Sequence, residues 1–165
     1  MHPWAESEKT RMTDIFSKVK RSAVMARIRA RGNKSTELAF MHLLRRHSIT
    51  GWRRHMSIAL PKQIASKGRS KSHKVRPDFV FPKARVAIFL DGCFWHGCPL
   101  HGTFPESNGT FWSTKLAANQ QRDRRINRQL RIRRWSVIRV WEHQLGDGLR
   151  LISKVRATLG KVSVT

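Results

Sequence analysis

The sequence predicts a single domain of mixed α/β class, and three observations lead to that prediction. The chain has 165 residues, the length of one ordinary domain, and 39% of them are hydrophobic, which is enough for a core. Apolar residues recur at helical spacing before residue 48 and after residue 110, and short β-rich runs lie between and after these stretches. The expected order is α-β-β-β-α-β with a final helix, packed around a small sheet.

The N-terminal half divides into an arm, a helical part and a polar stretch. Residues 1–21 lack clear periodicity and predict a basic arm outside a domain of residues 22–160. Residues 62–76 are rich in Lys, Ser and Gly and cannot bury themselves, which predicts a mobile basic loop inserted in the domain. The other expected elements are a short helix over 22–31, a helix over 35–47 and a first strand over 52–58.

The C-terminal half contains the expected centre of the sheet. Residues 78–81 and 85–91 are β-rich runs separated by Pro82-Lys83, which predicts two adjacent strands joined by a tight turn. Residues 92–109 form a segment interrupted by Gly and Pro that carries Cys, His and aromatic residues. The remaining expected elements are a long helix over 111–133, a core strand over 135–141 and a helix over 147–159.

The charge of the chain indicates a polyanionic partner. It carries 34 Lys and Arg against 10 Asp and Glu, a formal net charge of +24. These basic residues are interleaved with Trp, Phe, Ile and Val along the chain, unlike a low-complexity tail or one basic membrane-surface helix. We therefore expect a folded domain with one basic face, and a polyanion such as double-stranded DNA is the natural partner.

Neither a membrane nor a disulfide framework is expected. No apolar stretch approaches the length of a membrane span, and the N-terminus is polar where a signal peptide would be apolar, which predicts a cytoplasmic protein. Only two cysteines are present, Cys93 and Cys98. In a reducing compartment, metal binding or thiolate chemistry explains them better than a disulfide.

Two aspartates are expected at ends of the central strands. Asp78 begins one β-rich run, and Asp91 ends the next one thirteen residues later. Two nearby carboxylates can hold Mg²⁺, which takes oxygen ligands from protein, water and phosphate. The alternative is that each Asp merely ends a strand and starts a turn.

The run from Gly92 to His101 makes the catalytic interpretation stronger. In extended backbone the adjacent Phe94 and Trp95 would point to opposite sides, so at least one should be exposed, where it could wedge between bases. The alternative is a pair of core anchors. His96 lies five residues beyond Asp91 and could take a proton from an attacking water.

The same run offers metal ligands. Cys93 and Cys98 form a C-x4-C pair, His101 follows three residues later, and His143 lies just beyond the last expected strand. Four sulfur and nitrogen ligands would complete a tetrahedral structural Zn²⁺ site. His143 is the weaker member of this set, because no spacing links it to the others.

Two further carboxylates have an ambiguous role in the sequence. On the long helix, Asn119 and Asp123 share the apolar stripe, and a buried carboxylate there needs a partner. His96 is the best candidate, and the alternative is a salt bridge to a neighbouring arginine of the 122–125 segment. Glu37 lies in a first helical turn, where the helix dipole alone favours an acidic residue.

Taken together, several motifs resemble the very-short-patch-repair (Vsr) mismatch endonucleases over roughly residues 17–145. The most specific is Gly92-Cys93-Phe94-Trp95-His96. The supporting motifs, in the same order as in that family, are Pro77-Asp78-Phe79-Val80, Phe111-Trp112, Asn119, Arg122-Asp123-Arg124-Arg125 and Val140-Trp141-Glu142.

The resemblance implies a fold related to the type II restriction endonucleases, of the PD-(D/E)xK-related kind, stiffened by structural zinc. It places the active site on Glu37, Asp78, His96 and Asp123. On this model Asp78 would bind Mg²⁺ together with the backbone carbonyl near Leu90, with Asp91 as a further ligand or a group behind it, and His96 would activate the water. The set of DNA-contacting residues implied is Phe94, Trp95, Trp112 and Asn119.

The activity implied is nicking of one DNA strand at a T:G mismatch left by deamination of 5-methylcytosine. A monomer is expected because one asymmetric lesion requires one nick, and mismatch-repair proteins in the nucleoid are candidate partners. The chain departs from the family in its longer 62–76 stretch, in Asp91, and in His143, which replaces a Cys. Two alternatives stay open: a homing or restriction-associated endonuclease that cuts paired DNA, and a zinc-stabilised DNA-binding protein without catalysis.

Overall fold

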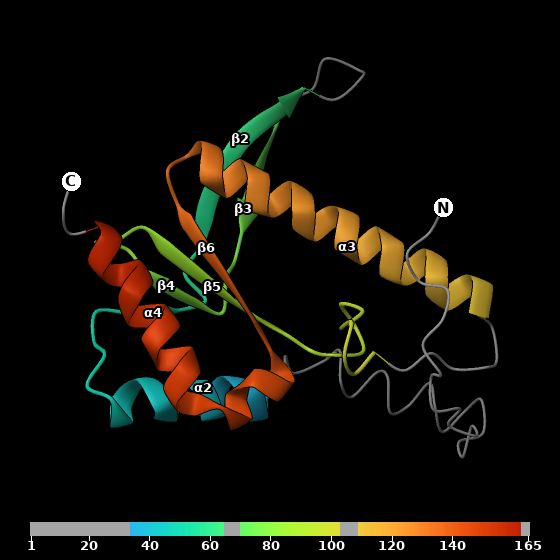
Figure 1. The fold of residues 1–165 in the computed structure, drawn as a ribbon. Coiled ribbons are helices and arrows are strands. Elements are labelled where there is room, and N and C mark those ends of the chain that lie inside the picture. Colours follow the sequence, from blue (N-terminus) through green and yellow to red (C-terminus); the bar gives the residue numbers. More distant parts are fainter. Residues whose placement is uncertain (1–33, 65–69, 103–108, 163–165) are drawn as a thin grey trace.

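The computed structural model describes residues 34–64, 70–102 and 109–162, and its centre is a four-stranded sheet (Figure 1). The strands lie in the order β1-β4-β5-β6, where neighbours β1/β4 and β4/β5 are antiparallel and β5/β6 are parallel. Their bounds are β1 Arg53–Arg54, β4 Phe79–Phe81, β5 Val86–Asp91 and β6 Ser136–Trp141. The predicted arm of residues 1–21 and the predicted helix over 22–31 lie outside the described residues.

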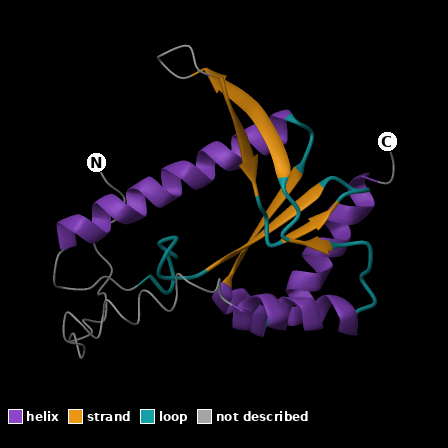
Figure 2. Cartoon of the chain, turned by 180° about the vertical axis from the view of Figure 1, so that it is seen from behind, coloured by secondary structure: helices purple, strands orange, loops and turns teal. Residues whose placement is uncertain are grey.

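Helices cover both faces of this sheet, which confirms the predicted α/β class (Figure 2). The helices are α2 Lys34–Arg46, α3 Gly109–Ile132, α4 Gly148–Val162 and the short 3-10 helix η1 Glu142–Gly146. All three long helices occur where helical spacing predicted them. None of the helices within the described ranges is long and apolar enough to cross a membrane.

The alternation of side chains along the strands creates two separate cores. On one face, Phe79, Ile88 and Val140 pack with Phe40 of α2 and Ile152 of α4. All of these residues are almost completely buried. On the other face a second core includes Leu130 of α3. Its buried members are Ile58, Leu60, Val75, Val80, Ala87 and Leu130. Because strand side chains alternate, one apolar strand can serve both helix layers.

The predicted mobile loop over residues 62–76 is wrong for most of its length. Strands β2 Ile58–Ile64 and β3 Ser70–Val75 pair antiparallel as a two-stranded ribbon that extends away from the sheet (Figure 1). The polar composition misled the prediction, since strand pairing satisfies backbone hydrogen bonds whatever the polarity of the side chains. The base of the ribbon is anchored by Ile58, Leu60 and Val75 in the second core.

The predicted strand over residues 52–58 is also wrong, because it is interrupted at His55. This residue adopts a left-handed φ of 52°, and its N–H donates to the carbonyl of Asp78 at 3.2 Å. A non-glycine residue in this conformation breaks an extended strand. The chain therefore leaves the sheet after β1 and starts the ribbon at Ile58, so that five strands rather than three precede α3.

The strand directions bring several sequence segments to one edge of the sheet. Because β4 and β5 are antiparallel, the start of β4 lies beside the end of β5. Because β5 and β6 are parallel and Asp91 pairs with Trp141, the segments that follow these two strands leave the sheet at the same edge. This edge holds every candidate catalytic residue that the strands and their loops supply.

Candidate active site and metal centre

Three clusters of titratable side chains gather at this edge, and within each cluster the possible ligand atoms lie within 4.8 Å of one another. We name them the Asp78 cluster, the His96 cluster and the thiol cluster. Their members are Glu37, His55 and Asp78; Asp91, His96 and Asp123; and Cys93, Cys98, His101 and His143. The structure thus brings together residues from α2, β5, α3 and η1, from the loops that follow β1 and β5, and from the segment that precedes β4.

In the Asp78 cluster a carboxylate is held at the end of the sheet. Asp78 Oδ2 accepts a hydrogen bond of 2.7 Å from the backbone N–H of Leu90 on the neighbouring strand. Burial raises the pKa of Asp78, and the negative charge of Glu37 raises it further, whereas the hydrogen bond from Leu90 opposes the shift. The cluster is therefore a place where a cation would relieve the cost of a buried carboxylate.

Glu37 is buried on the first turn of α2 and faces two basic side chains. Its Oε2 pairs with the guanidinium of Arg54 and lies 3.1 Å from His55 Nε2. Sequence reasoning assigned Glu37 through the family resemblance but missed His55, which lay within an expected strand. No spacing in the sequence points to His55, because only the left-handed turn after β1 carries it back to Asp78.

The His96 cluster confirms the predicted contact between His96 and Asp123. His96 Nδ1 lies 2.6 Å from Asp123 Oδ2 and 3.5 Å from Asp91 Oδ1. Burial alone would raise the pKa of Asp123, but the hydrogen bond to His96 and the nearby charge of Arg139 outweigh it and hold that pKa below its usual value. The alternative partner is present only as a longer contact of 3.5 Å from Arg122.

Arg139 is a second residue that sequence reasoning missed. It lies on β6, and its Nη1 is 2.9 Å from both oxygens of Asp91 and 2.9 Å from Asp123 Oδ2. The expected pairing of Asp91 with Asp78 around one metal is not what the clusters show, since Asp91 groups with His96 and Asp123. A charged residue between Ile138 and Val140 in a core strand was the indication available in the sequence, because such a charge needs a partner.

The aromatic residues of the loop after β5 form a packed group and correct one expectation. Phe94 and Trp95 are both half-buried rather than one being exposed, with ring centroids 5.1 Å apart in an edge contact. The backbone explains this: His96 N–H donates to Gly92 O and Cys98 N–H to Cys93 O, so the segment coils instead of extending. Adjacent side chains of a turn can share one side.

The other predicted DNA-contacting residues also lie in or beside this group. Trp112, at the start of α3, is only 9% exposed, and its ring packs 5.2 Å from Phe94. Phe111 is the outermost ring, at 60% exposed. Asn119 donates its amide hydrogen to the carbonyl of Trp95 at 3.0 Å, so its described contact is with the loop and fixes Trp95 to α3.

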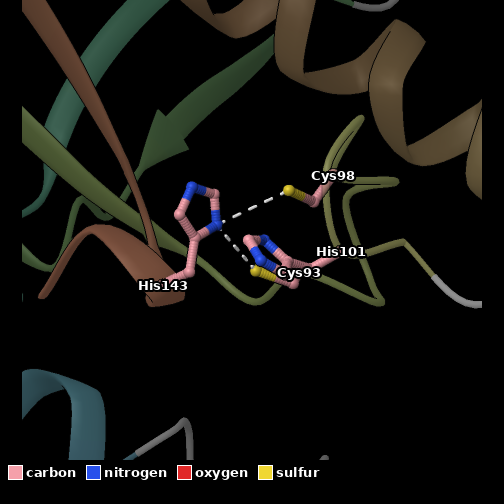
Figure 3. A group of neighbouring side chains, drawn as sticks. All are labelled: Cys93, Cys98, His101 and His143. Carbon is pink, nitrogen blue, oxygen red and sulfur yellow. Dashed lines mark hydrogen bonds between the residues drawn. The ribbon is translucent and has the colours of Figure 1, made fainter. Parts of the chain in front are cut away.

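The thiol cluster joins the loop after β5 to the end of β6, and its four side chains point toward one another (Figure 3). His143 Nδ1 lies 3.2 Å from Cys93 Sγ and 3.6 Å from Cys98 Sγ, and the rings of His143 and His101 are 4.4 Å apart. The strand register explains the position of His143: Asp91 pairs with Trp141, and Cys93 and His143 each follow two residues later.

The donor set and its spacing fit a zinc ion. Two thiols and two imidazoles are the ligands of a common structural site, in which bonds of about 2.0 to 2.3 Å keep the donor atoms between about 3 and 4 Å apart. Both cysteines are free thiols, and burial raises the pKa of Cys93, with the nearby Cys98 raising it further. A dication would offset the cost of ionising two thiols that face each other.

Comparison with known proteins finds relatives over most of the chain. A type II nicking enzyme, V.XorIIP of Xanthomonas oryzae pv. oryzae, is 35% identical over 150 residues, which cover 90% of this chain and 98% of the relative. The DNA mismatch endonuclease Vsr of Escherichia coli is 33% identical over 112 residues, or 67% of this chain and 71% of that protein.

A third relative is more similar over a shorter stretch. The type II nicking enzyme V.NaeI of Lentzea aerocolonigenes is 54% identical over 71 residues, which span 43% of each chain. A family model described as DNA mismatch endonuclease Vsr matches residues 13–101, from the N-terminal region to the end of the predicted ligand triplet. The chain therefore belongs to the Vsr family of DNA mismatch endonucleases.

Proposed function

We propose that this member of the family nicks one strand of duplex DNA at T:G mismatches left by deamination of 5-methylcytosine. The observation that supports a hydrolytic activity best is the position of the Asp78 and His96 clusters at one edge of the sheet, beside the aromatic loop. The mismatch target is supported by the family and by the 33% identical Vsr of Escherichia coli.

The residues at Asp78 fit a magnesium ion. Asp78 would hold it together with the backbone carbonyl near Leu90, since both groups offer oxygen and Asp78 already accepts the N–H of Leu90. The bound ion would supply positive charge to the phosphate oxygens and lower the pKa of a bound water. Glu37 lies behind Asp78, where its contacts with Arg54 and His55 fix the position of α2 against the cluster.

His96 is the proposed base, and its geometry supports that role. Because Asp123 accepts a hydrogen bond from Nδ1, the other ring nitrogen, Nε2, is left in the form that can take a proton from water. Asp123 also keeps the ring in one orientation, as a buried carboxylate does for the histidine of a hydrolytic triad. The half-buried ring retains contact with solvent from which a substrate water can come.

The aromatic group is the proposed sensor of the mismatch. Phe94 and Trp95 are half-buried on the loop that also carries His96, and Phe111 is exposed beside them. Inserting a ring between bases requires unstacking them, which costs about a few kcal/mol per step in paired DNA. A T:G step is already poorly stacked, so the cost there is smaller. The buried Trp112 packs against Phe94 and Trp95. A zinc ion in the thiol cluster would stiffen the loop that carries these two residues.

The names of the relatives support a second candidate, which is nicking at a paired site defined by its sequence. Two of the relatives reported above are named type II nicking enzymes. The same residues would serve either activity, because the chemistry at the phosphate is the same. Only the preference for a mismatch separates the two, and it is a property of the aromatic loop and the DNA rather than of the catalytic clusters.

The decisive experiment compares wild type, Asp78→Ala and a control, Asp147→Ala, on end-labelled duplexes that differ only in carrying T:G or T:A within a cytosine-methylation context. Asp147 is an exposed carboxylate at the start of α4. We expect Mg²⁺-dependent nicking of the T strand in the T:G duplex by wild type and control, and none by Asp78→Ala.

The other outcomes have distinct meanings. Equal cutting of both duplexes would replace the mismatch target with a paired one. Cutting by Asp78→Ala at the wild-type rate would remove Asp78 from the active site. If wild type binds the duplexes but cuts none of them with any divalent metal, the protein is a zinc-stabilised DNA-binding protein.

A further inference from the structure

Arg139 occupies a position where a charged residue is uncommon. It lies on β6 between the buried residues Ile138 and Val140, and it is the parallel-strand partner of Phe89. Its guanidinium lies 4.9 Å from the centre of the Phe89 ring, and only 20% of its side chain is exposed. A guanidinium in such surroundings needs several hydrogen-bond acceptors to offset its loss of water.

The acceptors are the two carboxylates on either side of the proposed base. Arg139 Nη1 is 2.9 Å from both oxygens of Asp91 and 2.9 Å from Asp123 Oδ2, and its Nε donates to Asn127 Oδ1 at 3.3 Å. Asp91 and Asp123 are only 4% and 8% exposed. The charge of these two carboxylates is thus compensated mainly inside the protein.

Both carboxylates are also near the same imidazole nitrogen. His96 Nδ1 is 2.6 Å from Asp123 and 3.5 Å from Asp91, so a small rotation of the ring would exchange one acceptor for the other. Arg139 engages both oxygens of Asp91 but only Oδ2 of Asp123, so Asp91 is the more fully engaged carboxylate and Asp123 is the better acceptor for His96. The ring then has one favoured orientation, and Nε2 points in one direction.

We propose that Arg139 is a positioning residue of the active site, which neutralises Asp91 so that Asp123 alone orients His96. The inference rests on the proposed role of His96 as the base. On this inference, the activity requires Arg139 only because Asp91 carries a negative charge beside His96. Loss of the arginine alone should therefore be more harmful than loss of both residues.

The physical consequence of removing only Arg139 is specific. Two buried carboxylates would then face each other across one imidazole without a counter-charge, and His96 would be drawn toward Asp91 as well as Asp123. A displacement of about 1 Å in a catalytic group can lower the rate on the order of 100-fold. Adding Asp91→Asn to Arg139→Met removes the competing charge, so Asp123 is again the only carboxylate that orients the His96 ring.

A double-mutant cycle tests this inference with Arg139→Met, Asp91→Asn, the double variant, and Arg150→Met as a matched control on α4. Arg150 is an exposed arginine whose side chain is 89% accessible. Thermal unfolding is measured first, and nicking of the T:G duplex is then measured in Mg²⁺ at a temperature where all variants are folded. We expect Arg139→Met to lower kcat on the order of 100-fold with KM changed by less than about twofold, and Arg150→Met to leave kcat unchanged.

The double variant decides between positioning and simple stability. We expect it to recover at least about tenfold of the lost kcat, which is a non-additive result for two residues in contact. An Arg139→Met protein that is less stable but has the wild-type kcat would overturn the inference, and so would a double variant as slow as Arg139→Met. If Arg139→Met does not fold, Arg139→Gln with and without Asp91→Asn removes the same charge and gives the same cycle. Wild type that nicks no duplex would contradict the proposed function instead.

Discussion

Asp123 is the residue in which stability and chemistry are most closely connected. It is a buried carboxylate on α3, 8% exposed, and it accepts contacts from both His96 and Arg139. An unpaired carboxylate in a buried position destabilises the folded protein, so interactions with its partners must offset the lost hydration of Asp123. The pKa of Asp123 is lowered in the folded protein, so its charged form is favoured more there than in the unfolded chain.

This gives a prediction for Asp123→Asn. A carboxylate whose pKa is lowered by folding stabilises the protein above the unfolded-state pKa of about 4, and that contribution disappears as the pH falls through the folded-state value. We expect the variant to lose about 3 kcal/mol of unfolding free energy at pH 7, with the difference from wild type shrinking below about pH 4. Urea unfolding of wild type and variant from pH 7 to below about pH 4 measures this difference in unfolding free energy.

The exposed Asp147 gives the comparison for that measurement. Its side chain is 58% accessible, and its only described ion pair is a contact of 3.7 Å to Arg150 of α4. Asp147 Oδ1 also accepts the Arg150 N–H at 3.2 Å, and an Asn side chain can keep this hydrogen bond. Asp147→Asn should therefore change the stability by much less, and with little dependence on pH. A loss of stability in Asp123→Asn that stays constant over the whole pH range would mean that packing, rather than charge, is responsible.

Among the elements, the loop after β5 depends most on contacts made elsewhere in the chain. It carries Cys93, Cys98 and His101, and His143 of η1 completes their cluster (Figure 3). Its main-chain hydrogen bonds are short-range turns, such as Cys98 N–H to Cys93 O at 2.8 Å. A metal that joins the loop to β6 would therefore fix the position of the aromatic group above the site.

We predict that His143→Ala lowers the zinc content from about one ion per chain and lowers the unfolding temperature, whereas His143→Cys retains the ion. Cysteine offers a donor of the same class, so the tetrahedral set stays complete. Elemental analysis and thermal unfolding with and without a chelator measure both effects. His42→Ala, an exposed histidine on α2, is the control. Zinc content equal to wild type in His143→Ala would remove His143 from the site.

At the scale of the whole molecule, the charges are unevenly distributed. The described residues include six carboxylates, of which Glu37, Asp78, Asp91 and Asp123 belong to the two catalytic clusters. The second half of α3 instead presents exposed arginines at steps of four and three residues, namely Arg124, Arg128 and Arg131. These arginines share α3 with Phe111 and Asp123, which makes them candidates for contacts with the phosphates of a bound duplex.

We predict that these three arginines contact phosphates, so that changing them together to Gln lowers the slope of log affinity against log salt by about 3. The control changes three exposed basic residues of the opposite layer, Arg45, Arg150 and Lys154, with the same loss of charge. Binding of a labelled T:G duplex over a range of salt concentrations gives both slopes. Equal changes in the two variants would show that the whole surface, rather than this helix, attracts the DNA.

Local sequence was sufficient for features whose parts lie close together in the chain. The spacing of apolar residues predicted α2, α3 and α4 within a few residues, and the ligand triplet of Cys93, Cys98 and His101 lies within one loop. Such features depend on interactions between near neighbours, which composition and spacing report directly. The ribbon of β2 and β3 was missed because residues 62–76 are mostly polar and their spacing does not mark the pairing of the two strands.

By itself, the sequence determined the mixed α/β class, the family, the basic character and the residue types of the candidate chemistry. Only the tertiary structure decided which of these residues meet: His143 with Cys93, His55 with Glu37 and Asp78, and Arg139 with Asp91 and Asp123. These contacts join residues 16 to 50 positions apart along the chain, from Arg139 with Asp123 to His143 with Cys93. They follow from strand register and from one left-handed turn, and both are set by long-range packing and hydrogen bonding rather than by local preference.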